Sequence, residues 1–166
     1  ILFPFSDEKL SGYTRSKSLP YPVGYTMKNK NPIQEVVADQ LKHDPEWSGK
    51  EYAGSDLLTD ILKALDDNKL DWPEDFTLLP CNEWIEKMRI EPNFYKFNAR
   101  DVSEMQIYEQ LLFQLAANFL ERTIKLVPIL DEDPELTIEP SLPIIPTGQL
   151  HIAYCNKLWY DNFFVS

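Results

Sequence analysis

Apolar residues recur three or four positions apart in four stretches of the chain, a spacing that places them on one face of a helix. The stretches begin at Pro32, after Ser55, near Cys81 and at Val102, and the last of them is the longest. Asn31 suits a helix cap, and proline suits the first helical position that follows it. The pattern therefore predicts four helices. Their expected buried positions are Ile33, Val36, Val37 and Leu41; Leu57, Leu58, Ile61, Leu62 and Leu65; Trp84, Ile85 and Met88; and Val102, Met105, Tyr108, Leu111, Leu112, Leu115, Ala116 and Phe119.

After these helices the apolar pattern changes to a period of two, which is typical of strands. Four strands are expected over 123–130, 136–139, 149–154 and 158–165, and a short one over 19–25. Because helices come first and strands follow, the sequence predicts an α+β domain. We expect a twisted, mostly antiparallel sheet of about four or five strands flanked by helices.

The remaining stretches are expected to be irregular. Residues 71–80 should form a loop anchored by Trp72 and Phe76, and residues 93–100 show no regular pattern. Residues 1–18 are expected to be a loop-rich N-terminal segment, followed by a single domain over 19–166. A chain of this length can bury enough surface to fold as one domain.

Acidic residues dominate the charge of the chain. Its 27 Asp and Glu against 16 Lys and Arg give a formal net charge of -11. Nucleic acids and anionic membranes attract proteins with an excess of basic residues, so this balance argues against both as partners. It is compatible with a basic protein partner and, more simply, with a solvated acidic surface.

Cysteine, histidine and the ends of the sequence add few constraints. Two cysteines are too few for a disulfide framework, and the two histidines show no metal-ligand spacing, so neither a metal nor a cofactor is expected. Apolar runs fall short of the roughly 20 residues of a membrane span. The first residues do not resemble a signal peptide. Because the chain starts at Ile1, we expect it to be part of a larger polypeptide in an intracellular, cytoplasmic setting.

Three segments carry a resemblance to a known family. The first is 31–41, which ends in Ala-Asp-Gln-Leu; the second is 81–126, with a Met-Arg pair and a Leu-Ala-Ala run in the long helix; the third joins 151–154 to 159–162. In this order they resemble the ovarian-tumour (OTU) family of deubiquitinating cysteine proteases over about residues 20–165. The resemblance implies a papain-like α+β fold and a history connected with ubiquitin.

The chain departs from the family at the catalytic positions. Pro32 stands at the nucleophile position and Trp159 at the general-base position, whereas Asp161 matches the residue that would orient a histidine. Proline lacks both a nucleophile and a backbone N–H for an oxyanion, and an indole cannot accept a thiol proton. In the loop before Pro32, Asn29 replaces the family's aspartate, and two lysines, Lys28 and Lys30, replace its glycines. The resemblance therefore implies a pseudoenzyme with a degenerate site, although an Asn-Pro helix start and a core aromatic explain positions 32 and 159 equally well.

Other nucleophile and base candidates are weaker. Cys81 follows a proline at a helix start, where a thiolate is favoured, and His151 is the downstream histidine, so a relocated cysteine hydrolase is conceivable. Cys81 and Cys155 are more simply small core residues, and His151 lies in a predicted strand. His43 suits the C-terminal end of the first helix.

The leading functional hypothesis is a non-catalytic module that binds a protein, with ubiquitin as the first candidate. In active relatives ubiquitin contacts the helical arm after the first helix and the sheet edge beside the cleft. By resemblance, these surfaces would include Asp56, Asp60, Trp72, Trp159, Tyr160 and Asn162. The alternative is a scaffold or interaction domain that no longer binds ubiquitin.

Overall fold

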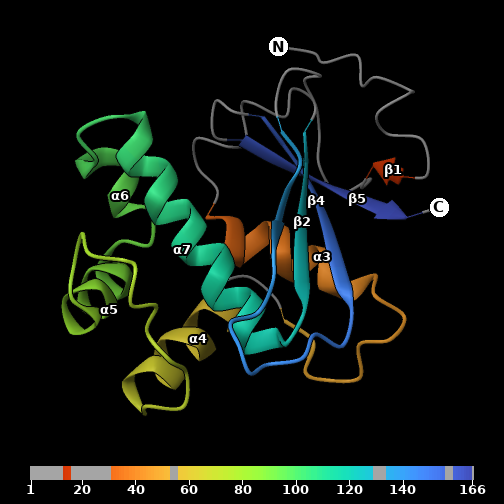
Figure 1. Ribbon diagram of the computed structural model, residues 1–166, viewed down its shortest axis with the longest axis horizontal. Coiled ribbons are helices and arrows are strands. Elements are labelled where there is room, and N and C mark those ends of the chain that lie inside the picture. The colour runs from red at the N-terminus through yellow and green to blue at the C-terminus, as the bar shows by residue number, and fades with distance from the viewer. Residues whose placement is uncertain (1–12, 16–30, 53–55, 129–133, 156–158, 166) are drawn as a thin grey trace.

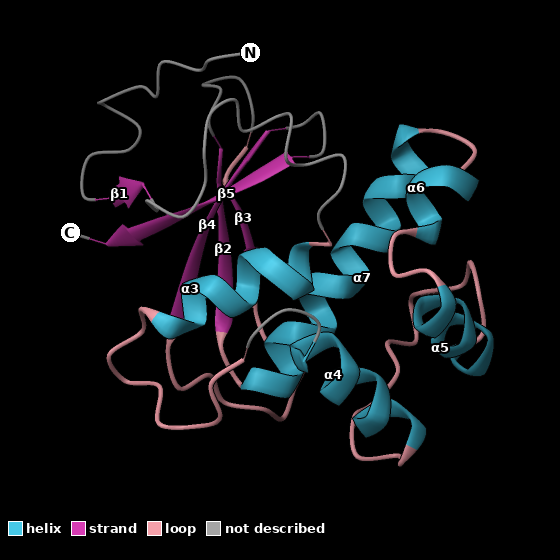
Figure 2. Ribbon diagram, turned by 180° about the vertical axis from the view of Figure 1, so that it is seen from behind, coloured by secondary structure: helices cyan, strands magenta, loops and turns pink. Residues whose placement is uncertain are grey.

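The computed structural model describes residues 13–15, 31–52, 56–128, 134–155 and 159–165. In chain order its elements are β1 (Tyr13–Arg15), the π-helix η1 (Pro32–Val37), α3 (Ala38–Lys42), α4 (Asp56–Asp66), α5 (Cys81–Ile90), α6 (Phe94–Asn98), α7 (Val102–Leu120), β2 (Thr123–Pro128), β3 (Leu136–Ile138), β4 (Gln149–Cys155) and β5 (Trp159–Val165). Helices α3 and α7 lie on one side of the sheet, and α5 and α6 lie on the side of α7 that faces away from the strands (Figures 1 and 2).

The strands form one mixed sheet in the order β1-β5-β4-β2-β3. β2 and β4 run parallel, with Thr123 opposite Gln149, and the other three pairs are antiparallel. After β2 the chain forms β3 on one side and then crosses to the other side, so β4 runs in the same direction as β2. The expected combination of helices and a sheet is confirmed, and the strands predicted at 123–130, 136–139, 149–154 and 158–165 all form.

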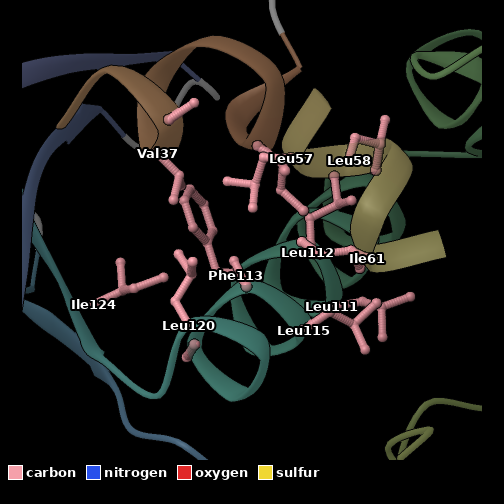
Figure 3. Packing of buried hydrophobic residues seen from close by; sticks show 14 of the residues in the cluster. Val37, Leu57, Leu58, Ile61, Leu111, Leu112, Phe113, Leu115, Leu120 and Ile124 are labelled. Atoms are coloured by element: carbon pink, nitrogen blue, oxygen red, sulfur yellow. The ribbon is translucent and has the colours of Figure 1, made fainter. Parts of the chain in front are cut away.

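Helix α7 passes through the middle of the hydrophobic core. Its N-terminus is capped by Asp101, whose carboxylate accepts a hydrogen bond from the backbone N–H of Glu104 at 2.9 Å. Four consecutive residues, 115–118, are buried, which one face of a helix cannot accommodate. Phe113 of α7 points toward Val37 of η1, and Leu112 lies beside the α4 side chains (Figure 3). The helix is therefore enclosed by η1, α4, α6, β2 and β3, all of which contact it.

The predicted core of α7 needs a correction. Tyr108, Leu112 and Leu115 are buried as expected, whereas Met105 and Phe119 are only partly buried against the core. A single apolar stripe cannot reveal a helix that is covered on several sides. Phe113 was missed for the same reason, because it faces η1 rather than α4.

The helix predicted from Asn31 begins where expected but has two parts. Its first six residues form the π-helix η1, and α3 continues to Lys42. π-Helical turns are rare, and the apolar spacing of this segment does not distinguish them from an α-helix. The helix ends at His43, its C-cap, as predicted.

The remaining predictions of helices, loops and strands were partly correct. Helices α4 and α5 match the sequence pattern, and residues 71–80 form a loop as expected. The prediction that 93–100 is irregular was wrong, because the short helix α6 forms there over five residues. Strand β1 was also missed within the segment 1–18. The strand expected over 19–25 and the boundary at residue 18 lie outside the described residues.

We expect Asp101→Ala to lower the free energy of unfolding by about 1 kcal/mol, because the first turn of α7 loses its cap. Urea denaturation followed by circular dichroism measures the change. Asp101→Asn is the matched control, since its amide oxygen keeps an acceptor for Glu104 N–H. Equal stability of the alanine and asparagine variants would contradict this role.

Candidate functional site

The segment expected to hold the degenerate site begins at a buried junction between η1 and the turn before α6. The Oδ1 atom of Asn31 accepts a hydrogen bond from the backbone N–H of Ile33 at 3.0 Å. Its Nδ2 group donates to the backbone carbonyl of Pro92 at 2.9 Å. Asn31 is 1% exposed, so both bonds are shielded from water. The cap predicted from sequence is therefore confirmed, and the same side chain also fixes η1 to a segment 61 residues away.

Pro32 is the first residue of η1 and is buried. Its ring nitrogen carries no hydrogen, and its side chain is a hydrocarbon. A cysteine hydrolase needs a thiolate at such a helix start, a neighbouring base, and backbone N–H donors for the oxyanion. Position 32 therefore supplies neither a nucleophile nor a donor.

Strand β5 contains Trp159 and Asp161, the positions that the resemblance assigns to the general base and to the residue that orients it. Its backbone pairs with β4, with Trp159 opposite Cys155 and Asp161 opposite Ala153. Helices η1 and α3 both contact β4 and β5, so the start of the first helix and the last strand belong to one region of the fold. The side chains of Trp159, Tyr160, Asp161 and Asn162, and all of 28–30 with Asn29, lie outside what the structure describes.

A buried polar group lies next to this junction, where α6 packs on α7. Tyr95 is fully buried, and Glu109 of α7 is 1% exposed. Burial, reinforced by the negative charge of Glu109, holds the pKa of Tyr95 well above its ordinary value. Burial lowers the pKa of the Lys96 ammonium, and Glu109 opposes that effect. The phenol therefore stays neutral at physiological pH, which suits a structural role better than proton transfer.

The structure does not bring Cys81 and His151 together. Cys81 begins α5 and His151 lies in β4, and these elements are on opposite sides of α7 (Figures 1 and 2). The expectation that the helix start favours a thiolate was wrong. Burial, and then the negative charge of Asp66, raise the pKa of the Cys81 thiol. The pKa of His151 is lowered, first by burial and then by the positive charge of Lys125.

Two of the three contact residues expected in the helical arm, Asp60 and Trp72, have partners within the fold. Asp56 is exposed at the start of α4, and one turn later Asp60 forms an ion pair with Lys50 at 3.1 Å. The hydrogen bond to Asp60 is the main reason that the pKa of Lys50 is raised. Trp72 is half-buried and packs on Trp84, with ring centroids 5.5 Å apart. Trp72 therefore serves the core, whereas Asp56 remains an exposed charge.

Sequence reasoning missed a buried ion pair that ties three segments together. Nε of Arg122 lies 2.8 Å from the carboxylate of Asp44, and the two side chains are only 5% and 11% exposed. The same guanidinium donates to the hydroxyl of Thr147 at 2.6 Å and stacks over Trp47, whose ring centroid is 5.0 Å from Cζ. No local motif marks such a pair, because its partners are 78 residues apart.

Two general findings limit the chemistry of the described residues. Among them, no group of three His, Cys, Asp or Glu side chains could hold a metal ion. In the same part of the chain, no helix is both long and apolar enough to cross a membrane.

Comparison of the chain with protein-family models, with curated proteins and with solved structures gives no match.

We expect Asn31→Ala to lower the free energy of unfolding by about 2 kcal/mol, because Ile33 N–H and the Pro92 carbonyl both lose a buried partner. Asn98→Ala is the matched control. It removes one hydrogen bond, to the Phe94 carbonyl, from an exposed asparagine, and should cost about 0.5 kcal/mol. Thermal and urea denaturation of both variants measure the difference. Equal losses would show that Asn31 does not anchor η1.

Proposed function

We propose that this chain is a non-catalytic, OTU-like domain that binds a protein, with ubiquitin as the first candidate. The proposal rests on the resemblance of 31–41, 81–126 and 151–162 to the OTU pattern. The arrangement of helices and a mixed sheet is compatible with that pattern.

The observation that carries the non-catalytic part is the buried proline at the start of η1. Pro32 occupies the position where the family pattern has its cysteine, and η1 contacts the strand that contains Trp159. A thiol at this point would have the helix dipole behind it and the last strand beside it. Proline leaves the helix start without a nucleophile. The helix start can therefore not be the site of a covalent acyl transfer.

Charge supports a protein partner with basic residues around its contact face. The domain has a formal net charge of -11, and its described surface exposes acidic residues on α4 such as Asp56. Ubiquitin's recognition face is flanked by basic residues, so the two surfaces are complementary in sign. Complementary charge mainly accelerates association and selects partners, and its effect weakens as salt increases.

Titration of the isotope-labelled domain with mono- and di-ubiquitin, followed by NMR at two salt concentrations, tests this function. We expect localised, saturable shifts in β4, β5 and the start of η1, and weaker binding at the higher salt concentration. Trp159→Ala should reduce the affinity at least threefold. Ile90→Ala is the control, because Ile90 is 85% exposed on α5, away from this region.

Two outcomes of the titration would contradict the proposal. An absence of shifts at millimolar ubiquitin would remove ubiquitin as the partner and leave a scaffold domain. Shifts confined to α5, with Trp159→Ala without effect, would contradict the proposed surface even if ubiquitin binds.

A further inference from the structure

A groove runs along β3, the edge strand that β2 and β4 separate from β5 in the sheet. It has a volume of about 290 Å³ and is formed by α7, the loop 73–76 and β3. From α7, Ile107, Gln110, Leu111 and Gln114 line it at the spacing of one helical stripe. Ile107 is 44% exposed, which is unusual for an isoleucine in the helix that forms the centre of the core.

Among the described strands, the one beside the groove has a pairing partner on only one of its edges. β3 pairs with β2 on one side and is the terminal strand of the order in the part of the chain that the structure describes. All three of its residues, 136–138, line the groove. Leu136 and Ile138 are partly buried against the core, and Thr137 is exposed. A strand edge beside a groove with apolar and polar side chains can accept an extended peptide, whose main chain adds to the sheet while its side chains enter the groove.

Hydrogen bonds hold the two walls of the groove, α7 and β3, in place relative to each other. The amide of Gln114 donates to the carbonyl of Glu139, directly after β3, at 2.9 Å. Asn118, one turn further along α7, accepts from the backbone N–H of Ser141 at 2.7 Å. These bonds fix the end of β3 relative to α7. A peptide would therefore meet a preformed surface, which reduces the entropy lost on binding.

The charged residues that line the groove, or adjoin its lining residues in sequence, are acidic. Asp75 lines it, and Glu74, Glu135 and Glu139 are exposed next to the lining residues in sequence. The lining contains no basic side chain among the described residues. Lys125, the nearest basic residue on the sheet, lies opposite Thr137 on β2, on the paired side of β3.

We propose that β3 and this groove bind an extended segment of a partner protein in which apolar and basic residues alternate. The segment adds to β3 as a further strand, its apolar side chains contact Ile107 and Leu111, and its basic side chains approach the acidic rim. This goes beyond the proposed function and does not depend on it, because β3 and β5 are separated by β2 and β4 in the sheet.

Fluorescence anisotropy with labelled synthetic peptides tests the proposal on the intact chain. The probe is an eight-residue peptide of alternating valine and lysine, and its counterpart has glutamate in place of lysine. We expect saturable binding of the basic peptide and at least tenfold weaker binding of the acidic one. Two further peptides carry N-methyl groups on alternate residues, one set on each edge. Only the set that faces β3 should lose affinity, because N-methylation removes the N–H groups that pair with the strand.

Matched variants locate the site. Ile107→Lys should weaken binding of the basic peptide at least tenfold, and Ile90→Lys, which makes the same change on exposed α5, should leave it unchanged. If circular dichroism shows that Ile107→Lys is unfolded, the exposed groove residue Gln110 takes its place as Gln110→Lys.

Several results would overturn the proposal. They are no binding of the basic peptide at millimolar concentration, equal binding of the acidic peptide, and equal loss for Ile107→Lys and Ile90→Lys. Unchanged affinity of both N-methylated peptides would exclude strand addition. A concentration-dependent dimer that disappears in Ile107→Lys would identify a second copy of the chain as the occupant and would also overturn it.

Discussion

The enclosure of α7 on several sides is the constraint on which the other elements depend. Residues 115–118 are buried without interruption, and η1, α4, α6, β2 and β3 all contact the helix. Ala116 and Ala117 contribute small, fully buried side chains to this run. Since such a core is close-packed, a shift of any surrounding element would leave a cavity beside α7. The position of η1 relative to the sheet follows largely from this packing.

Two buried polar contacts then fix the relative positions of elements that apolar packing alone would fix less tightly. Asn31 holds the start of η1 to Pro92, and Arg122 at the end of α7 holds Asp44 and Thr147. Apolar contacts tolerate small displacements, whereas a hydrogen bond weakens steeply when its geometry changes. A buried charge is also costly without its partner, so the Arg122 contact enforces one arrangement of the segments before β2 and β4. The buried junction at Pro32 is therefore held in one position.

The same fixed framework accounts for two different surfaces. In one region, η1 contacts β4 and β5, and Pro32 at the start of η1 has no reactive group. At the opposite end of the strand order, β3 has no second pairing strand among the described residues and lies beside a partly exposed stripe of α7. Both regions are built mainly from helices and strands, which suits recognition of a partner without large rearrangement.

Sequence patterns predicted the elements better than the contacts between them. The stripe from Leu57 to Leu65 and the cap at Asn31 are local signals, and both were correct. The π-helix was missed because its apolar spacing mimics an α-helix, and α6 because its five residues are too few to show a period.

Contacts between distant residues left no trace in the sequence. The Arg122–Asp44 pair and the Asn31–Pro92 bond join residues 78 and 61 positions apart, and neither involves a motif. The groove beside β3 could not be predicted, because the sequence does not show which strand lies at the edge of the sheet. The expectation of a degenerate site could be formed from the sequence, because it depends on the chemical identities of Pro32 and Trp159.

Reaction of the purified chain with a ubiquitin-based electrophilic probe, followed by intact mass spectrometry, tests the central claim that the domain has lost its nucleophile. An active OTU protease treated in parallel shows that the probe is competent. The account predicts that the chain keeps its unmodified mass, because Pro32 cannot react and burial raises the pKa of the Cys81 thiol. A stoichiometric adduct on Cys81 or Cys155 that is lost on substitution by serine would contradict it and identify the chain as a cysteine hydrolase.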